Sequence, residues 1–303
     1  MPLAPPATLS GDLLTISRFL SNPTLLQRRL RDYKDLRFVS DQILTQRFRS
    51  TGGAVLYEQS EPSVTDRTVE AVGAGSEYPF ANLPTGTAAL AAIAKWGQKV
   101  RLTDEEIGRN VYGGAAVDRA LRKVVNSIIG KVDSITMSAI LSAIAAQTTA
   151  TGVWSTSTTA IPWKGILQGR TEIVQRNLGY TPDTVVVNDT GYMYLMTDVG
   201  LAGLLRREST DSPIYTGQID KIGGMSIIVS PTMPALTAMV LDSTQFGGMA
   251  DEVDGAPGYS VSDLAVQVKS IRLEGNDAWD LQGRRKTVPV VQELGAAHLI
   301  TYT

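Results

Sequence analysis

The sequence predicts an α+β fold with a long spine helix and a protruding hairpin. Apolar residues recur at spacings of three and four over residues 115–147, which is the pattern of an amphipathic helix. Two extended stretches, 53–59 and 88–102, flank a polar segment, and an alternating stretch follows at 261–273. Short strands and helices are expected in the part of the chain between the spine helix and the stretch 261–273. We therefore expect one compact α+β part joined to elongated parts.

The composition excludes several kinds of site and several classes of protein. The 303 residues include no cysteine and one histidine, His298. The absence of thiols excludes disulfides, thiolate metal sites and cysteine nucleophiles, and a single histidine excludes a site with two histidine ligands. The formal net charge of -2 argues against a dedicated nucleic-acid-binding protein, which would carry a basic excess. No uninterrupted apolar run approaches the length of a transmembrane helix, so no membrane contact is expected.

The first 50 residues contain eight basic and four acidic side chains and little apolar surface. Within them, residues 24–31 are expected to form a short helix, with Asn22 as its cap and Pro23 at its first position. Three leucines in this helix are too few for a core of its own. Residues 1–50 are therefore interpreted as an arm that lies on something else.

The next segment reverses the charge, because residues 51–80 contain five acids and one basic residue, Arg67. The strands on either side of it predict a protruding hairpin, and a long two-stranded finger is marginally stable without a neighbour. Two alternatives remain for the opposite charges of arm and finger. They are two solvated surfaces, or they meet between subunits and set the register of the contact.

The remaining elements follow in order along the chain. The spine helix over residues 115–147 would be about 50 Å long at 1.5 Å per residue. A second amphipathic helix is expected at 163–178 and a short one at 190–196, with strands at 184–187, 225–229 and 236–241. One long alternating strand is expected over 261–273, then a turn at 275–277, a return strand from 278 and an extended segment at 288–302.

Motifs that would carry chemistry are missing, so neither an enzyme activity nor a cofactor is expected. Asp104, Glu105 and Glu106 are explained as acids in the first turn of a helix. Residues 251–255 resemble half of a calcium loop, but Val253 occupies a ligand position. His298 lies in an extended apolar run and is expected to be a structural strand residue.

Four stretches, taken in order, carry a resemblance to a known family. Residues 91–110 read AAIAKWGQKVRLTDEEIGRN, a basic strand that ends in an acidic helix start, and Asp133 lies in the second half of the spine helix. Residues 223–246 and 283–303 contain further strand patterns in the same order. The chain resembles the major capsid protein of tailed double-stranded DNA phages, which has the Hong Kong ninety-seven capsid fold.

The resemblance implies a division of the chain. Residues 1–50 would be the N-terminal arm and 51–90 the extended E-loop. Residues 91–149 and 258–287 would form the P-domain, with the spine helix at 115–147, and residues 150–257 and 288–303 the A-domain. The E-loop contains no lysine, so the lysine-mediated covalent linkage of some relatives is not expected.

The resemblance also implies a function and partners. The chain would assemble with itself, as pentamers and hexamers, into the icosahedral shell around packaged DNA. Portal, scaffolding or decoration proteins would be further partners, and the shell would be made in the bacterial host cytoplasm and form part of the virion. An encapsulin-type compartment shell is the related alternative, and a soluble α+β hydrolase that uses acids such as Asp104, Glu105 or Asp189 is the alternative from another class.

Two sets of residues are predicted to make the contacts. Assembly contacts are expected from charged side chains of the arm and the E-loop, namely Arg28, Arg29, Arg31, Glu58, Glu61, Asp66, Arg67, Glu70 and Glu77. Non-specific contacts with DNA are expected from basic residues of the spine helix, Arg119, Arg122 and Lys123. The alternative for these three is a solvated helix face.

Overall fold

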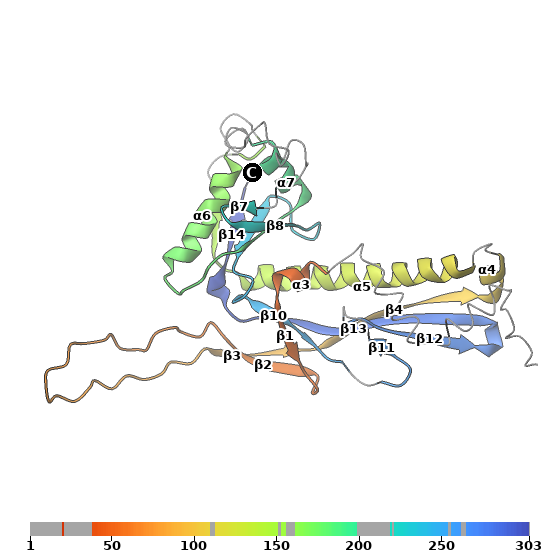
Figure 1. Ribbon diagram of the computed structural model, residues 1–303, viewed down its shortest axis with the longest axis horizontal. Helices are drawn as coiled ribbons and strands as arrows, with labels where there is room; N and C mark the ends of the chain where they lie inside the picture. Colours follow the sequence, from red (N-terminus) through yellow and green to blue (C-terminus); the bar gives the residue numbers. More distant parts are fainter. Residues whose placement is uncertain are drawn as a thin grey trace, which may run out of the picture.

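A computed structural model describes residues 20, 38–109, 113–150, 153–155, 161–198, 219, 221–253, 256–261 and 265–302. The molecule is elongated, with a loop extending from one end and a helix–sheet layer running toward the other (Figure 1). The predicted short helix at 24–31 lies outside the described residues.

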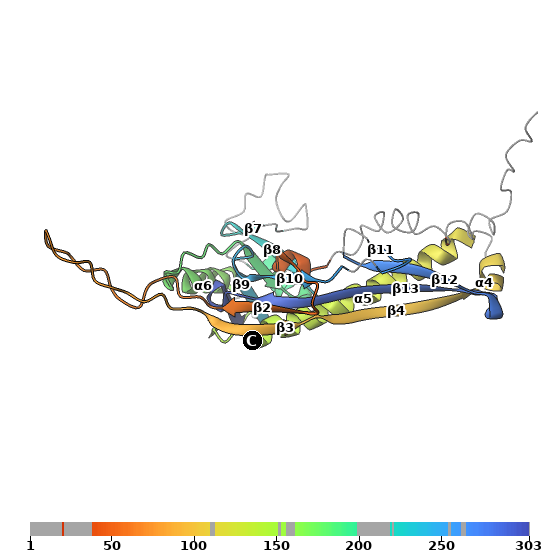
Figure 2. The same ribbon diagram turned by 90° about the horizontal axis from the view of Figure 1, so that it is seen from below.

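The elongated body is one six-stranded sheet covered on one face by helix α5, Gly113–Ala143 (Figures 1 and 2). We call it the long sheet. Its strand order is β1-β10-β13-β12-β11, and β4 pairs with β13 on the other side. The strands are β1 (Gln46–Arg49), β4 (Ala94–Thr103), β10 (Gly247–Asp251), β11 (Ser260–Val261), β12 (Gln267–Leu273) and β13 (Ala278–Val291).

Helix α5 confirms the predicted spine, with bounds two and four residues from those expected. Its buried face includes Val117, Leu121, Val124, Ile128 and Val132, which repeat at the helical spacing. The window Ala116–Ala143 is long and apolar enough to cross a membrane by length and composition, and half of it is buried. Packing against the long sheet accounts for that composition.

One glycine sets how closely α5 approaches the long sheet. A Cβ added at Gly283 of β13 would lie 2.7 Å from Val124 Cγ1 and 3.0 Å from Ile128 Cδ1. Real Cβ atoms do not come so close to another carbon. The absence of a side chain at this position therefore lets the helix lie directly on the strand.

The far end of the long sheet contains the predicted turn. β12 and β13 are joined by the 3₁₀ turn Glu274–Asn276 (η1), and Asp277 closes it with a left-handed φ of 43°. The single strand expected over 261–273 is wrong in one respect. β11 and β12 are separate strands in antiparallel pairing, so the chain reverses direction between them.

Helix α4, Asp104–Arg109, follows β4 directly. The Thr103 hydroxyl accepts from the Glu106 N–H, and the Glu106 carboxylate accepts from the Thr103 N–H, each at 3.2 Å. This reciprocal capping box begins the helix. Asp104, Glu105 and Glu106 are the first-turn acids that the sequence predicts.

A second sheet lies beside the end of α5 (Figure 1). Its order is β5-β14-β9-β6-β8-β7, with helices α6 and α7. The elements are β5 (Gln147–Thr149), α6 (Pro162–Gln175), β6 (Thr184–Val187), α7 (Asp189–Met196), β7 (Lys221–Ile222), β8 (Met225–Val229), β9 (Thr237–Leu241) and β14 (Ala297–Thr301). Most bounds agree with the sequence prediction. The Asn188 side chain caps α7 by accepting from the Gly191 N–H at 2.7 Å.

The two sheets are joined by continuous chain. β13 runs without interruption from residue 278 to 291, and the 3₁₀ turn Leu294–Ala296 (η2) leads into β14. The predicted P-domain to A-domain boundary at 287/288 lies inside this strand. The extended segment expected at 288–302 is therefore the end of β13, a turn and a second strand.

Candidate assembly interface

Among the residues that the structure describes, the E-loop forms a long exposed projection. Its base is the antiparallel pair β2 (Ala54–Gln59) and β3 (Thr87–Ala92), and residues 60–86 have no helix or strand. The loop extends away from both sheets (Figure 2). A segment of this length without secondary structure is typical of a binding element.

The base of the E-loop is attached to the body by backbone contacts. The Ser60 N–H donates to the Gln292 carbonyl at 2.8 Å, whereas the bond from the Ile93 N–H to the Gly53 carbonyl, also 2.8 Å, closes the hairpin itself. Gln59 Nε2 donates to the Val291 carbonyl at 3.2 Å. The bonds from Ser60 and Gln59 hold the base beside the end of β13, and the rest of the loop projects.

Some of the predicted E-loop charges shape the loop itself. The Asp66 carboxylate accepts from the Asn82 N–H and from Asn82 Nδ2, both at 2.8 Å, and so joins the two legs. Arg67 donates to Glu70 from Nε and Nη2 at 3.1 to 3.2 Å. Glu58, Glu61 and Glu77 are exposed, without an ion pair among the residues described.

The E-loop also exposes apolar side chains. Val64, Val69, Tyr78, Phe80 and Leu83 are 73% to 95% exposed. An aromatic and aliphatic group of this kind on an extended loop is typical of a protein contact surface. The charge pattern alone did not predict these five residues.

A groove of about 380 Å³ lies between the E-loop base and the long sheet. Phe48, Val55, Tyr57 and Val290 contribute apolar walls, and the acids Glu58, Glu61 and Glu293 line it as well. Glu58 and Glu61, which are exposed, therefore lie at a groove that is open to solvent.

The face of the long sheet away from α5 is basic. Gly283 and Leu281 of β13 pack toward the helix, so alternate residues of the sheet point to the opposite face. That face carries the acids Asp280 and Glu252 and six basic residues, Lys95, Lys99, Arg101, Lys269, Arg284 and Lys286. We call these six residues the basic sheet face.

Asp280 organises two members of this face. Its carboxylate accepts from Arg101 Nε at 2.8 Å and from Lys99 Nζ at 3.2 Å. The hydrogen bond from Arg101 lowers the pKa of Asp280, and Lys99 adds to the effect. One carboxylate is thereby shared by two cations, which leaves an excess of positive charge.

The three predicted DNA contacts lie together on α5. Arg119, Arg122 and Lys123 are exposed on one side of the helix, at spacings of three and four. Among the α5 side chains that the structure describes, no exposed one is acidic. The other predicted contacts, Arg28, Arg29 and Arg31, lie outside the described residues.

Part of the basic sheet face could be predicted from the sequence. Lys95, Lys99 and Arg101 alternate along one strand, which places them on one side. Lys269 and Lys286 join them only through the register of β12 and β13, since Lys269 pairs opposite Gln282 and Lys286 opposite Lys95. Strand pairing between distant segments could not be deduced from the alternation.

Nothing in the described residues suggests catalysis. They contain no group of three or more metal-binding side chains. Asp104 pairs with Arg272 through two bonds of 2.6 and 2.7 Å, and His298 lies buried in β14, as predicted for a structural strand residue. An elongated sheet, a spine helix and a projecting loop with exposed apolar side chains are together the architecture of a structural protein.

Solved structures share this architecture. The chain matches a phage-related protein from Bordetella bronchiseptica with a TM-score of 0.61, 10% identity and coverage of 93% of this chain and 97% of that one. It matches the capsid of cyanophage P-SCSP1u at 0.60, 12% identity and 85% of both chains. It matches the SrpI encapsulin of Synechococcus elongatus at 0.58, 13% identity and 99% and 96%. The predicted Hong Kong ninety-seven fold is confirmed.

The sequence itself identifies the family. A profile of the family described as "Phage capsid protein" matches residues 86–299, whereas no curated protein sequence matches the chain significantly. The chain belongs to this family of phage capsid proteins. It is a structural component of the virion rather than an enzyme, and the family match favours a phage capsid over the encapsulin alternative.

Proposed function

We propose that copies of this chain close into an icosahedral shell around the packaged double-stranded DNA of a tailed phage. The E-loop is the observation that carries this proposal, because it projects from the body and exposes apolar and acidic groups that a monomer leaves in water. Pentamers and hexamers are the units of such a shell. Assembly in the host cytoplasm, a portal, and scaffolding or decoration proteins follow from the family resemblance.

Within this shell, the acidic E-loop of one subunit docks on the basic sheet face of another. The basic sheet face has four more basic than acidic side chains, counting Asp280 and Glu252, and residues 51–80 have four more acidic than basic ones. Complementary charges of this kind guide association and fix register. The exposed apolar side chains at the end of the loop contribute burial once the register is set.

Exchange of charges tests this contact. The purified chain is examined by negative-stain electron microscopy as wild type, with Glu58→Lys and Glu61→Lys, with Lys95→Glu and Lys269→Glu, and with all four changes. We expect closed shells for the wild type, none for either pair alone, and recovery in the fourfold variant. The change Glu105→Lys, on exposed helix α4, serves as a control for altered net charge.

Each outcome bears on a different part of the proposal. A wild type that stays a monodisperse monomer under all conditions would contradict shell formation. Shells that form normally in both paired variants would contradict docking of the E-loop on the basic sheet face and leave shell formation standing. Particles that hold enzyme cargo and no DNA in the infected host would support the compartment alternative.

A further inference from the structure

Residues 38–49 of the predicted arm are fixed to the body of their own subunit; we call them the arm root. Phe38, Ile43 and Leu44 are at most 1% exposed and belong to the main hydrophobic core. The arm root contains the short helix α3, Ser40–Ile43, and strand β1, which pairs in parallel with β10. The C-terminal end of the predicted arm is therefore packed against the body of its own subunit.

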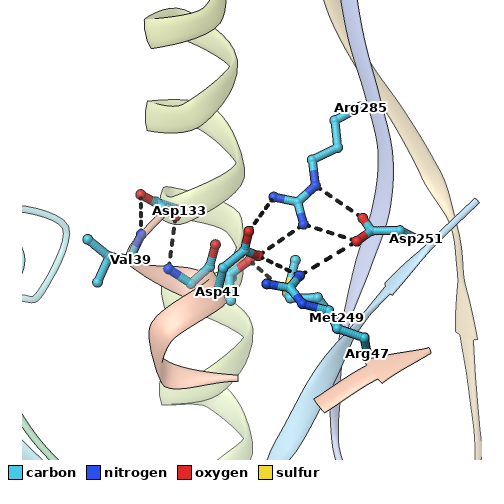
Figure 3. Close-up of polar contacts among 9 residues, drawn as sticks. Val39, Asp41, Arg47, Asp133, Met249, Asp251 and Arg285 are labelled. Carbon is cyan, nitrogen blue, oxygen red and sulfur yellow. Dashed lines mark hydrogen bonds and ion pairs between the residues drawn. The ribbon is translucent and has the colours of Figure 1, made fainter. Parts of the chain in front are cut away.

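The spine helix caps α3. Val39 precedes the helix, and α3 has no capping side chain of its own. Instead, Asp133 of α5 accepts from the Ser40 N–H at 3.0 Å and from the Val39 N–H at 3.2 Å (Figure 3). Asp133, on which part of the family resemblance rests, therefore supplies the negative charge and acceptors that a helix start requires, from 93 residues away.

A buried arginine joins the arm root to the long sheet. Arg285 of β13 is fully buried and lies between two carboxylates, Asp41 of α3 and Asp251 of β10 (Figure 3). It donates to Asp41 Oδ1 at 2.9 Å and to Asp251 Oδ1 at 3.1 Å. Its guanidinium also lies 4.2 Å from the Phe38 ring centroid. Arg47, which is half exposed, completes the cluster through Asp41 at 2.8 Å.

The arm is held at a second point. The Ser270 hydroxyl of β12 donates to the backbone carbonyl of Leu20, which is fully buried. The basic segment 24–31 lies in sequence between Leu20 and the arm root. Leu20 and the arm root are therefore both attached to the long sheet and α5 of the same subunit.

We propose that Asp133, Arg285 and Asp41 form a latch that positions the arm for assembly. The proposal rests on the shell-forming function above. Buried ion pairs contribute little net stability compared with apolar packing, and their best-supported role is to select one register. The latch gives the arm root one position against α5 and so fixes the position of residue 38 relative to the body. A subunit with a released latch stays folded and assembles poorly.

Hydrogen exchange on the soluble subunit tests the latch without requiring a shell. The variants are Asp41→Asn and Asp133→Asn, with Asp41→Glu as the conservative rescue and Arg49→Gln, at an exposed β1 residue outside the cluster, as the matched control. We expect Asp41→Asn and Asp133→Asn to speed exchange in the peptide 38–49 at least tenfold. The peptide 117–140 of α5 should be unchanged, and the rescue and control variants should resemble the wild type.

Electron microscopy of the same variants supplies the second readout. We expect fewer closed shells from Asp41→Asn and Asp133→Asn than from the wild type. Faster exchange in both peptides together would show that the arm root is an ordinary part of the core and would overturn the latch. Unchanged exchange in the peptide 38–49 would also overturn it. So would a variant whose arm root exchanges faster but which still forms normal shells. If the wild type forms no shells, the proposed function fails, and the exchange data still decide whether the arm root releases separately.

Discussion

His298 of β14 and Arg176, just after α6, are directly hydrogen-bonded, with Arg176 Nη2 3.0 Å from His298 Nδ1. Because a guanidinium only donates, His298 must accept at Nδ1 and carry its proton on Nε2. Nε2 lies 2.7 Å from the Thr148 hydroxyl of β5. The only histidine of the chain thus links α6 to the edge of the second sheet as a neutral ring.

This geometry predicts a dependence of stability on pH. Burial, together with the charge of Arg176, lowers the pKa of His298, and Glu172 offsets part of the effect. The unfolded chain therefore binds more protons than the folded one between the lowered pKa and about 6.5. Stability is complete above about 6.5 and falls as the pH decreases below it.

Thermal unfolding of the subunit between pH 5 and 8 measures this dependence. The change His298→Gln keeps one acceptor and one donor without a titrating group and should flatten the slope in this range. Equal slopes in the two proteins would contradict the assignment, because no other histidine is present.

Two glycines of the helix–sheet layer should respond in opposite directions to alanine. Gly283→Ala places a methyl group against Val124 and Ile128 and should destabilise the subunit by about 1–3 kcal/mol, as overpacking does. Gly130→Ala, at an exposed position of α5 with nothing within 4 Å, should stabilise it by about 1 kcal/mol. Chemical denaturation measures both, and a stabilising Gly283→Ala would contradict the close contact described above.

Mature shells should dissociate into single chains when they are denatured. The E-loop, residues 51–90, has no lysine, and the described residues place the nearest one, Lys95, on β4 outside the loop. A denaturing gel of boiled shells should therefore show one band near 32.5 kDa. A ladder of multiples would show covalent linkage between subunits and contradict this prediction.

The arm arginines should matter for assembly and not for folding. Reversal of Arg28, Arg29 and Arg31 to glutamate should prevent shell formation while the melting temperature of the subunit stays unchanged. Reversal of the exposed α5 residue Lys131 is a single-site control outside the arm. Normal shells from the triple variant would show that the arm and its neighbours do not match by charge.

The basic face of α5 should contact DNA through phosphates only. Changing Arg119, Arg122 and Lys123 to glutamine should weaken binding of DNA to assembled shells or their fragments equally for all sequences. With three phosphate contacts at about 0.9 each, the slope of log K against log salt should become shallower by about 2.7. An unchanged slope would favour the solvated helix face instead.

Local patterns of the sequence predicted much of the fold. The spine helix, strand β6 and the turn before β13 each depend on the spacing of apolar residues or on turn residues within a short window. The predicted strand 261–273 failed because alternation continues across the reversal between β11 and β12. In the same way, charge counts identified an acidic E-loop but not the use of Asp66 and Arg67 within it.

The sequence alone determined the spine helix, the family and the opposite charges of arm and E-loop, because each of these depends on residues that are close together in the sequence. The tertiary structure alone decided which distant charges meet. Arg285 reaches Asp41 across 244 positions, and the basic sheet face combines β4, β12 and β13. Such contacts depend on strand register and on the docking of one element against another, and no local window of sequence encodes either.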